Sequence, residues 1–384
     1  MSRTFIYLSN WKHFAEDEGL ALYEFNNETG EMTYIDMAAH VSCNVTQYDK
    51  KRGLLYVSEE TEKLPWTKVG GGGRMLVYDI DKVNGNLTLV NEQLAFATNP
   101  CQFTQDPTGQ YLILANHASH ASITKVVRDT KGKYGHIQLW DDAPLVLYPL
   151  NEKGHIGEPL DVVLTAGDGP HPHQQHPMLH SAEYAPGGEF FVVSDLGSDK
   201  IFTFKIDYER KVLVQKDIFN DIPGSTPRYI KFHPTLPYFY VNHEGGSMEV
   251  LRMKYDKNGS IEPVDRVWTV DDVENIKVLN DQQQAMIMDP TGHYIYDVLR
   301  GQQNEIAVFS IDQESGALTR IQNQPLKGQW ARGCTLSPDG RFLITMCMMS
   351  GEVEVFAVGE DGRLIHTGHT YSQPGCSWAT FVEV

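Results

Sequence analysis

The chain repeats one phrase, a tight turn followed by a run of apolar and β-branched residues. Clear copies begin at residues 106, 289 and 337, as DPTGQYLILAN, DPTGHYIYDVL and SPDGRFLITMC, and looser copies begin at 185 and 233. A repeat of about 50 residues is typical of a propeller or another array, in which each unit buries its apolar face against its neighbours. This periodicity outweighs the length of 384 residues, which alone would allow two or three ordinary domains.

Each repeat divides into four strand-like segments, the first before the turn and the others after it, joined by further turns rich in Gly and Asn. The segment 377–381 has no second strand after it, and the N-terminal segment 5–10 has no first strand before it. We expect the two ends to complete one sheet, which closes a ring and removes its open edges. The prediction is an all-β chain, a single domain over residues 1–384. It is a seven-bladed β-propeller with four antiparallel strands per blade.

Charge and composition limit the partners. The net charge of −18 argues against nucleic acid and anionic membranes, which attract basic surfaces. The chain contains no run of 18 apolar residues, so no membrane span is predicted. The start MSRTFIYLSN lacks the features of a signal peptide. Five cysteines without a CxxC pair indicate free thiols in a reducing compartment. We therefore expect a cytoplasmic protein.

Three insertions lengthen the ring, at residues 59–74, roughly 117–142 and 166–179. In an up-and-down blade, the loops between strands two and three lie on the same face as the loops between blades. All three insertions are therefore expected to crowd one face, and insertions in repeat proteins commonly build the binding face.

The same geometry predicts which side chains surround the mouth of the central channel, because the first strand starts where the second strand ends. Six residues before the turn proline stand Cys101, His180, Arg228, Gln284 and Arg332. The ends of the second strands supply Asn10, Glu59, Glu60, Asn116, His117, Asp195, His243, Glu244 and Arg300. A propeller channel can be polar for structural reasons alone. The convergence of three arginines, a histidine and a glutamate favours a site.

Three stretches, 180–207, 226–250 and 332–356, resemble the bacterial 6-phosphogluconolactonase family of seven-bladed propellers, which is related to the fungal carboxy-cis,cis-muconate cyclase. The resemblance covers nearly the whole chain, and the phrase DLGSDKIF is its more specific part. By this resemblance the catalytic residues are His180, Arg228, Glu244 and Arg300. The chain departs from many members at Tyr229, where they have His, and this leaves the substrate's identity open.

The resemblance implies hydrolysis of a sugar lactone, foremost 6-phosphogluconolactone. Because arginines crowd the proposed site, we expect the reaction to need neither a metal ion nor a cofactor. His180 is the first choice for general acid or base, while Glu244 could activate water or orient a neighbour. Arg228 and Arg300 offer donors suited to a carboxylate, a phosphate or an oxyanion, although each could instead serve a structural ion pair. The expected substrate-binding residues are Arg332, Gln284, Asn116, His243 and Asp195.

Other interpretations stay open. A calcium site would use the ring of carboxylates and amides at Asn10, Asn44, Glu59, Glu60, Asn116 and Asp195, although the nearby arginines disfavour a cation. The tract HPHQQH at 171–176 suggests zinc, but its Pro and Gln residues favour a plain loop. The cysteines are expected to be small core residues. The alternative functions are a lactonase or cycloisomerase acting on a non-phosphorylated lactone, and a propeller that only binds partners.

Overall fold

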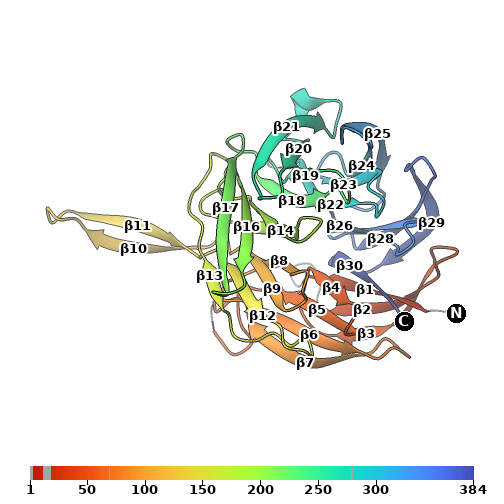
Figure 1. The fold of residues 1–384 in the computed structure, drawn as a ribbon, viewed down its shortest axis with the longest axis horizontal. Coiled ribbons are helices and arrows are strands. Elements are labelled where there is room, and N and C mark those ends of the chain that lie inside the picture. The colour runs from red at the N-terminus through yellow and green to blue at the C-terminus, as the bar shows by residue number, and fades with distance from the viewer. Residues whose placement is uncertain (1–2, 12–18, 69, 278–279) are drawn as a thin grey trace.

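The computed structural model describes residues 3–11, 19–68, 70–277 and 280–384, and these form a ring of seven four-stranded antiparallel sheets (Figure 1). The predicted seven-bladed β-propeller is thus confirmed. Within the described residues, one short 3-10 helix, Val273–Asn275, interrupts the strands, and no helix is long and apolar enough to cross a membrane.

The blades follow one another along the chain. The blade that joins the termini contains β1 (Thr4–Asn10), β2 (Leu20–Phe25), β3 (Met32–Ala39) and β30 (Cys376–Glu383). The next contains β4 (Thr46–Asp49), β5 (Leu54–Glu59), β6 (Arg74–Ile80) and β7 (Leu87–Leu94). The third contains β8 (Pro100–Gln105), β9 (Tyr111–Asn116), β12 (Leu145–Pro149) and β13 (Asp161–Val163).

Four more blades complete the ring. They are β14 (Leu179–Tyr184), β15 (Phe191–Asp195), β16 (Lys200–Asp207) and β17 (Val212–Asn220); then β18 (Pro227–Phe232), β19 (Tyr238–His243), β20 (Glu249–Tyr255) and β21 (Ile261–Trp268). They continue with β22 (Gln282–Met288), β23 (Tyr294–Arg300), β24 (Glu305–Ile311) and β25 (Leu318–Pro325); and end with β26 (Ala331–Leu336), β27 (Phe342–Cys347), β28 (Glu352–Val358) and β29 (Leu364–Ser372).

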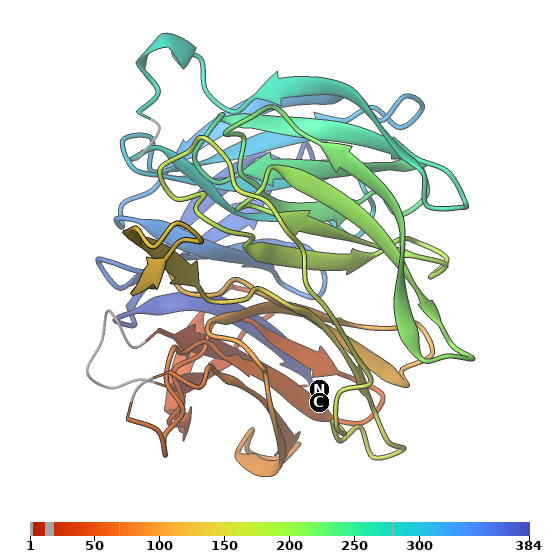
Figure 2. The same ribbon diagram turned by 90° about the vertical axis from the view of Figure 1, so that its left-hand side faces the viewer.

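The two ends of the chain close the ring as predicted. β1 pairs with β30 in antiparallel register from Thr4 opposite Glu383 to Ser9 opposite Trp378. The two termini consequently lie side by side (Figures 1 and 2). Because each partner strand is remote in sequence, this blade forms only when the whole ring has formed.

A tyrosine in the second strand of four blades ties each blade to its neighbour. Its ring is buried between the sheets, and its hydroxyl donates to a glycine carbonyl in a hairpin turn of the next blade. The four bonds are Tyr7 to Gly85 (2.6 Å), Tyr56 to Gly154 (2.6 Å), Tyr240 to Gly316 (2.7 Å) and Tyr296 to Gly362 (3.1 Å). Each glycine has a positive φ, so the turn needs a residue without a side chain there.

The three insertions lie on one face, as predicted, since each contributes side chains to the same cavity. The largest forms a separate hairpin of β10 (Ser122–Arg128) and β11 (Tyr134–Trp140), which projects away from the ring (Figure 1). The hairpin itself does not cover the channel, because its two strands pair with each other. Only the residues next to the hairpin, together with residues from the other two insertions, reach the cavity described below.

Candidate active site

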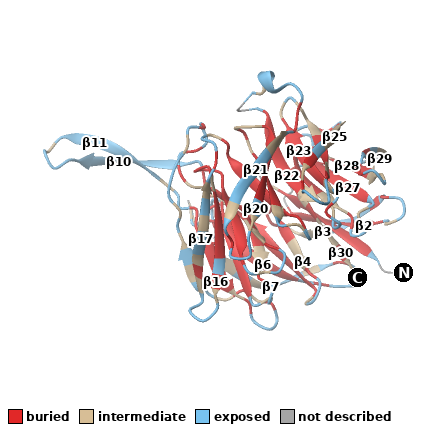
Figure 3. Ribbon diagram, turned by 45° about the horizontal axis from the view of Figure 1, so that its top comes forward, coloured by how far each residue is buried: buried red, intermediate tan, exposed pale blue. Residues whose placement is uncertain are grey.

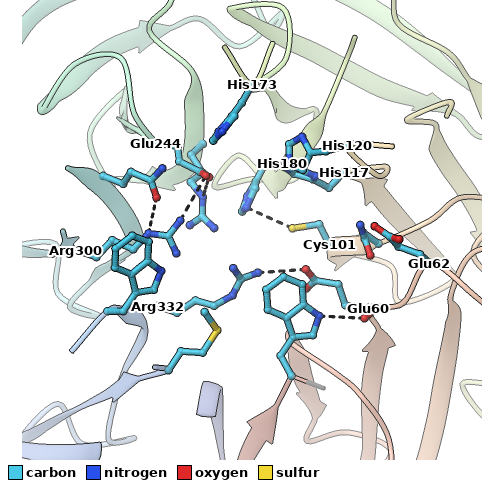
Figure 4. A pocket seen from close by; sticks show the side chains of 16 residues that line it. Glu60, Glu62, Cys101, His117, His120, His173, His180, Glu244, Arg300 and Arg332 are labelled. Atoms are coloured by element: carbon cyan, nitrogen blue, oxygen red, sulfur yellow. Dashed lines mark hydrogen bonds and ion pairs between the residues drawn. The ribbon is translucent and has the colours of Figure 1, made fainter. Parts of the chain in front are cut away.

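A cavity of about 350 Å³ lies where the first strands of the blades begin and the second strands end (Figure 4). Aromatic and charged side chains line it. They are Trp11, Glu60, Glu62, Asn99, Cys101, His117, His120, His173, His180, Arg228, Glu244, Gln282, Arg300, Trp330, Arg332 and Met348. All four predicted catalytic residues and Arg332 are among them.

A β-bulge at the start of the first strand turns one side chain toward the cavity. Leu179 pairs with Asp195 and Ser181 with Ser194, so His180 between them has no partner in the ladder. The same irregularity leaves Cys101 and Arg332 unpaired in their blades. Bulges re-aim a side chain in this way and are common beside active sites.

At the end of the second strand, the residue that lines the cavity is the first one after it in most blades. Glu244 follows the turn proline Pro234 by ten residues. The cavity-lining residues at the same distance from the turn proline in other blades are His117 and Met348, which also follow their strands, and Arg300, which is the last residue of β23. Because successive side chains of a strand alternate in direction, the residue one place earlier points away from the cavity.

This alternation corrects two of the expected substrate contacts. Asn116 and Asp195 each occupy the earlier place, are fully buried and do not line the cavity. The Asn116 amide donates to Pro144 O at 2.9 Å. The Asp195 carboxylate accepts from the backbone N–H groups of Met178 (2.8 Å) and Gly197 (3.0 Å). Both side chains therefore stabilise neighbouring backbone segments by hydrogen bonding.

The other two expected contacts, His243 and Gln284, are also buried outside the cavity lining. The His243 ring contacts Glu249 O and Asp221 Oδ2, each at 2.9 Å, and so joins two structural segments. The cavity receives Gln282 in place of Gln284, because Gln282 pairs directly with Arg300 across the strands. Its amide oxygen accepts a hydrogen bond from Arg300 Nε at 2.5 Å.

Glu244 lies between two arginines. Arg228 Nε donates to Glu244 Oε2 at 2.6 Å, and Arg300 Nη2 lies 3.7 Å from Glu244 Oε1. Burial alone would raise the pKa of Glu244, but the two cations outweigh it and lower the value to about 2. Glu244 is therefore a carboxylate at neutral pH and a weak base, which suits it to hold the guanidinium groups in place.

Each of the three cavity arginines stacks on an aromatic ring. Their guanidinium carbons lie 4.9, 4.9 and 4.6 Å from the ring centroids in the pairs Arg228–Tyr229, Arg300–Trp330 and Arg332–Trp11. Arg332 Nη2 also donates to Glu60 Oε1 at 3.2 Å. Burial lowers the pKa of Arg300 to about 9, and the neighbouring Arg228 and Arg332 contribute. Three buried cations at this spacing favour the entry of an anion.

His180 is held as a neutral imidazole. Its pKa lies well below the ordinary value, first because the ring is buried and then because Arg228 is close. Its Nε2 lies 3.5 Å from Cys101 Sγ, and its Nδ1 has no hydrogen-bond partner among the described residues. The ring also contacts Tyr229, with centroids 5.1 Å apart. Such a ring can accept a proton from a group bound in the cavity.

Sequence reasoning placed His117 at the mouth but missed that His120 and His173 join it to form a row of histidines. His120 and His173 come from the insertions and meet at a centroid distance of 5.5 Å, while His117 lies 5.4 Å from His120 and 5.9 Å from His180. His117 and His120 lie across the cavity from Arg300 (Figure 4). Burial lowers the pKa of His117 to about 4. The one sequence signal was their position in insertions on the predicted mouth.

The alternative metal interpretations find no support in the geometry of the described residues, where no group of three or more His, Cys, Asp or Glu side chains could hold a metal ion. Glu59, part of the proposed calcium ring, makes a double ion pair with Arg74 at 2.5 and 2.8 Å. The five cysteines are free and buried, as expected.

Comparison with known proteins agrees with this geometry. The family model described as "Lactonase, 7-bladed beta-propeller" matches residues 5–381. A 6-phosphogluconolactonase of Bacillus subtilis is 30% identical over 362 residues, or 93% of this chain and 92% of that protein, and one of Formosa agariphila is 24% identical over 93% and 91%. The solved periplasmic gluconolactonase of Pseudomonas aeruginosa has the same fold, with a TM-score of 0.84 and 21% identity over 99% of both chains. The chain therefore belongs to the lactonase family of seven-bladed β-propellers, and it is an enzyme that hydrolyses a lactone.

Proposed function

We propose that this enzyme opens a sugar lactone, foremost 6-phosphogluconolactone, to the free acid without a metal ion. One observation carries the proposal: the cavity joins a neutral imidazole to three guanidinium groups whose donors are not all used. Within the described residues, Arg228 Nη1, Arg332 Nε and His180 Nδ1 are buried and have no hydrogen-bond partner. Unpaired buried polar atoms of this kind are costly, and a bound anionic substrate would accept hydrogen bonds from the two guanidinium groups.

In the proposed reaction, His180 takes a proton from a water molecule as its oxygen attacks the ring carbonyl carbon. Arg228 stabilises the oxyanion that forms. The bond from the carbonyl carbon to the ring oxygen then breaks, and the proton on His180 passes to the departing alkoxide. The product is a hydroxy acid, which ionises to a carboxylate. Glu244 keeps Arg228 and Arg300 in position and takes no proton, consistent with its pKa of about 2.

The 6-phosphate is assigned to Arg300 and Arg332. These two groups lie on adjacent blades and repel each other, since Arg332 contributes, after burial and together with Arg228, to the low pKa of Arg300. A dianionic phosphate between them would remove this repulsion, and guanidinium groups bind phosphate with paired donors. The Bacillus subtilis and Formosa agariphila relatives are named for this phosphorylated lactone. The buried free thiols fit a reducing compartment, so the cytoplasm remains the proposed location.

The test is a panel of lactones with and without a 6-phosphate, each assayed with and without a chelator. We expect the phosphorylated lactone to have the highest kcat/KM and the chelator to change nothing. His180→Ala should lower kcat by about 10²–10⁴. Near-normal turnover of this variant would remove His180 from the mechanism, while loss of activity on chelation would overturn the metal-independent route. Equal kcat/KM for both kinds of lactone would exclude a phosphate subsite.

A further inference from the structure

The hairpin of β10 and β11, called the arm below, is held to the body at its base, where Trp140 stacks on His176 with ring centroids 5.3 Å apart. Nearly all of its side chains are exposed, and it extends away from the ring (Figures 1 and 3). Its two strands hydrogen-bond only to each other in the described sheets. An isolated two-stranded hairpin is at best marginally stable in water, so an ordered arm needs a surface to pack against.

The arm has one apolar face. Side chains opposite each other on paired strands share a face. Lys125 and Gly135 lie on this side of the ribbon together with four apolar side chains: Ile123 lies opposite Leu139, and Ile137 and Val127 lie beside them. These side chains are 64, 41, 45 and 36% exposed in that order. The other face is mainly polar, with Ser122, Thr124, Val126, Arg128, Tyr134, His136, Gln138 and Trp140.

The charge of the arm differs in sign from that of the rest of the protein. Residues 122–140 contain four Lys and Arg side chains and one Asp, a net charge of +3, so the remainder of the chain carries −21 of the total of −18. A partner that fits the arm is therefore acidic. The acidic remainder would be repelled by nucleic acid and by anionic membranes, which carry the same sign.

A second copy of this chain offers both a surface for the arm to pack against and an acidic charge opposite to that of the arm. We propose that two copies exchange their arms. Each arm lies with its apolar face against the acidic body of the other propeller. Each strand of the arm has seven residues, and at about 3.3 Å per residue it extends about 23 Å, enough to cross onto a neighbouring molecule. Reciprocal exchange of arms gives a dimer with a two-fold axis, which is the commonest symmetry of soluble oligomers.

Analytical ultracentrifugation of the full-length protein over a dilution series tests the proposal. We expect a dimer that dissociates on dilution, and more readily at high salt, because the attraction is partly electrostatic. The variant Ile123→Thr/Ile137→Thr/Leu139→Thr keeps β-branched residues in the strands but removes the apolar face, and it should be monomeric. The matched control Val126→Thr changes a side chain that is 77% exposed on the opposite face, and it should remain dimeric.

A monomeric wild type at every concentration would overturn the proposal, as would a triple variant that dimerises like the wild type. Binding of the wild-type monomer to vesicles containing phosphatidylserine would instead assign the arm to a membrane. A photo-cross-linker attached to the cysteine of the variant Lys131→Cys identifies the surface that the arm contacts. The label reacts selectively at this position because the native thiols are buried. Cross-links to the partner's body support the exchange, and cross-links confined to the partner's arm contradict it.

Discussion

Glu244→Gln should destabilise the folded protein by an amount that depends on pH. The carboxylate lies 2.6 Å from Arg228 and within 3.7 Å of Arg300, and its side chain is 19% exposed. Its pKa falls from 4.5 to about 2. At about 1.36 kcal/mol per pKa unit, these surroundings favour the charged form by about 3 kcal/mol. Glutamine keeps the shape of the side chain but leaves the buried Arg228 without a counter-ion.

The pH dependence follows from the sign of the shift. A carboxylate whose pKa is lowered by folding adds its full stabilisation above pH 4.5, the value of the unfolded chain. That stabilisation disappears as the pH falls toward 2. Between pH 7 and pH 3 the contribution should drop from about 3 to about 1 kcal/mol. The gap between wild type and Glu244→Gln should therefore shrink by about 2 kcal/mol over this range.

Urea denaturation at several pH values, with a check that refolding is complete, measures this gap as a difference in unfolding free energy. Glu383→Gln is the matched control, because its ion pair with Lys50 is exposed and such pairs contribute about 0–1 kcal/mol. A gap between wild type and Glu244→Gln that is the same at pH 7 and pH 3 would refute the electrostatic argument. So would a gap no larger than that of the control.

Three further outcomes are expected. In a pH–rate series, the acidic limb of kcat/KM should lie well below pH 6.5. Burial and Arg228 lower the pKa of His180, so this base stays deprotonated as the pH falls. An acidic limb above pH 6.5 contradicts this assignment. Arg300→Ala should raise KM by about 10- to 100-fold for a 6-phosphorylated lactone and much less for a neutral one, which steady-state kinetics would show. Deleting residues 377–384 removes the partner of β1 and should sharply lower the melting temperature, and an unchanged value in calorimetry would disprove the closure of the ring.

The repeat in the sequence was enough to predict the propeller and its closure, because turn residues and alternating strands are local properties of the chain. The spacing from the turn proline also placed His180, Arg228 and Arg332 at the cavity, since the first strand has a register irregularity at this point in each of their blades. Glu244 and Arg300 followed from the same end of the blade, because the second strand ends where the first strand starts.

Only the tertiary structure decided which neighbours of those residues reach the cavity. One step of strand register separates Glu244, which lines it, from His243, which is buried against Asp221, and the sequence marks both simply as polar. Trp330 and His173 come from loops whose course depends on packing between blades far apart in sequence. The pKa values of the cavity groups likewise depend on burial and on charges from several blades, which no local pattern records.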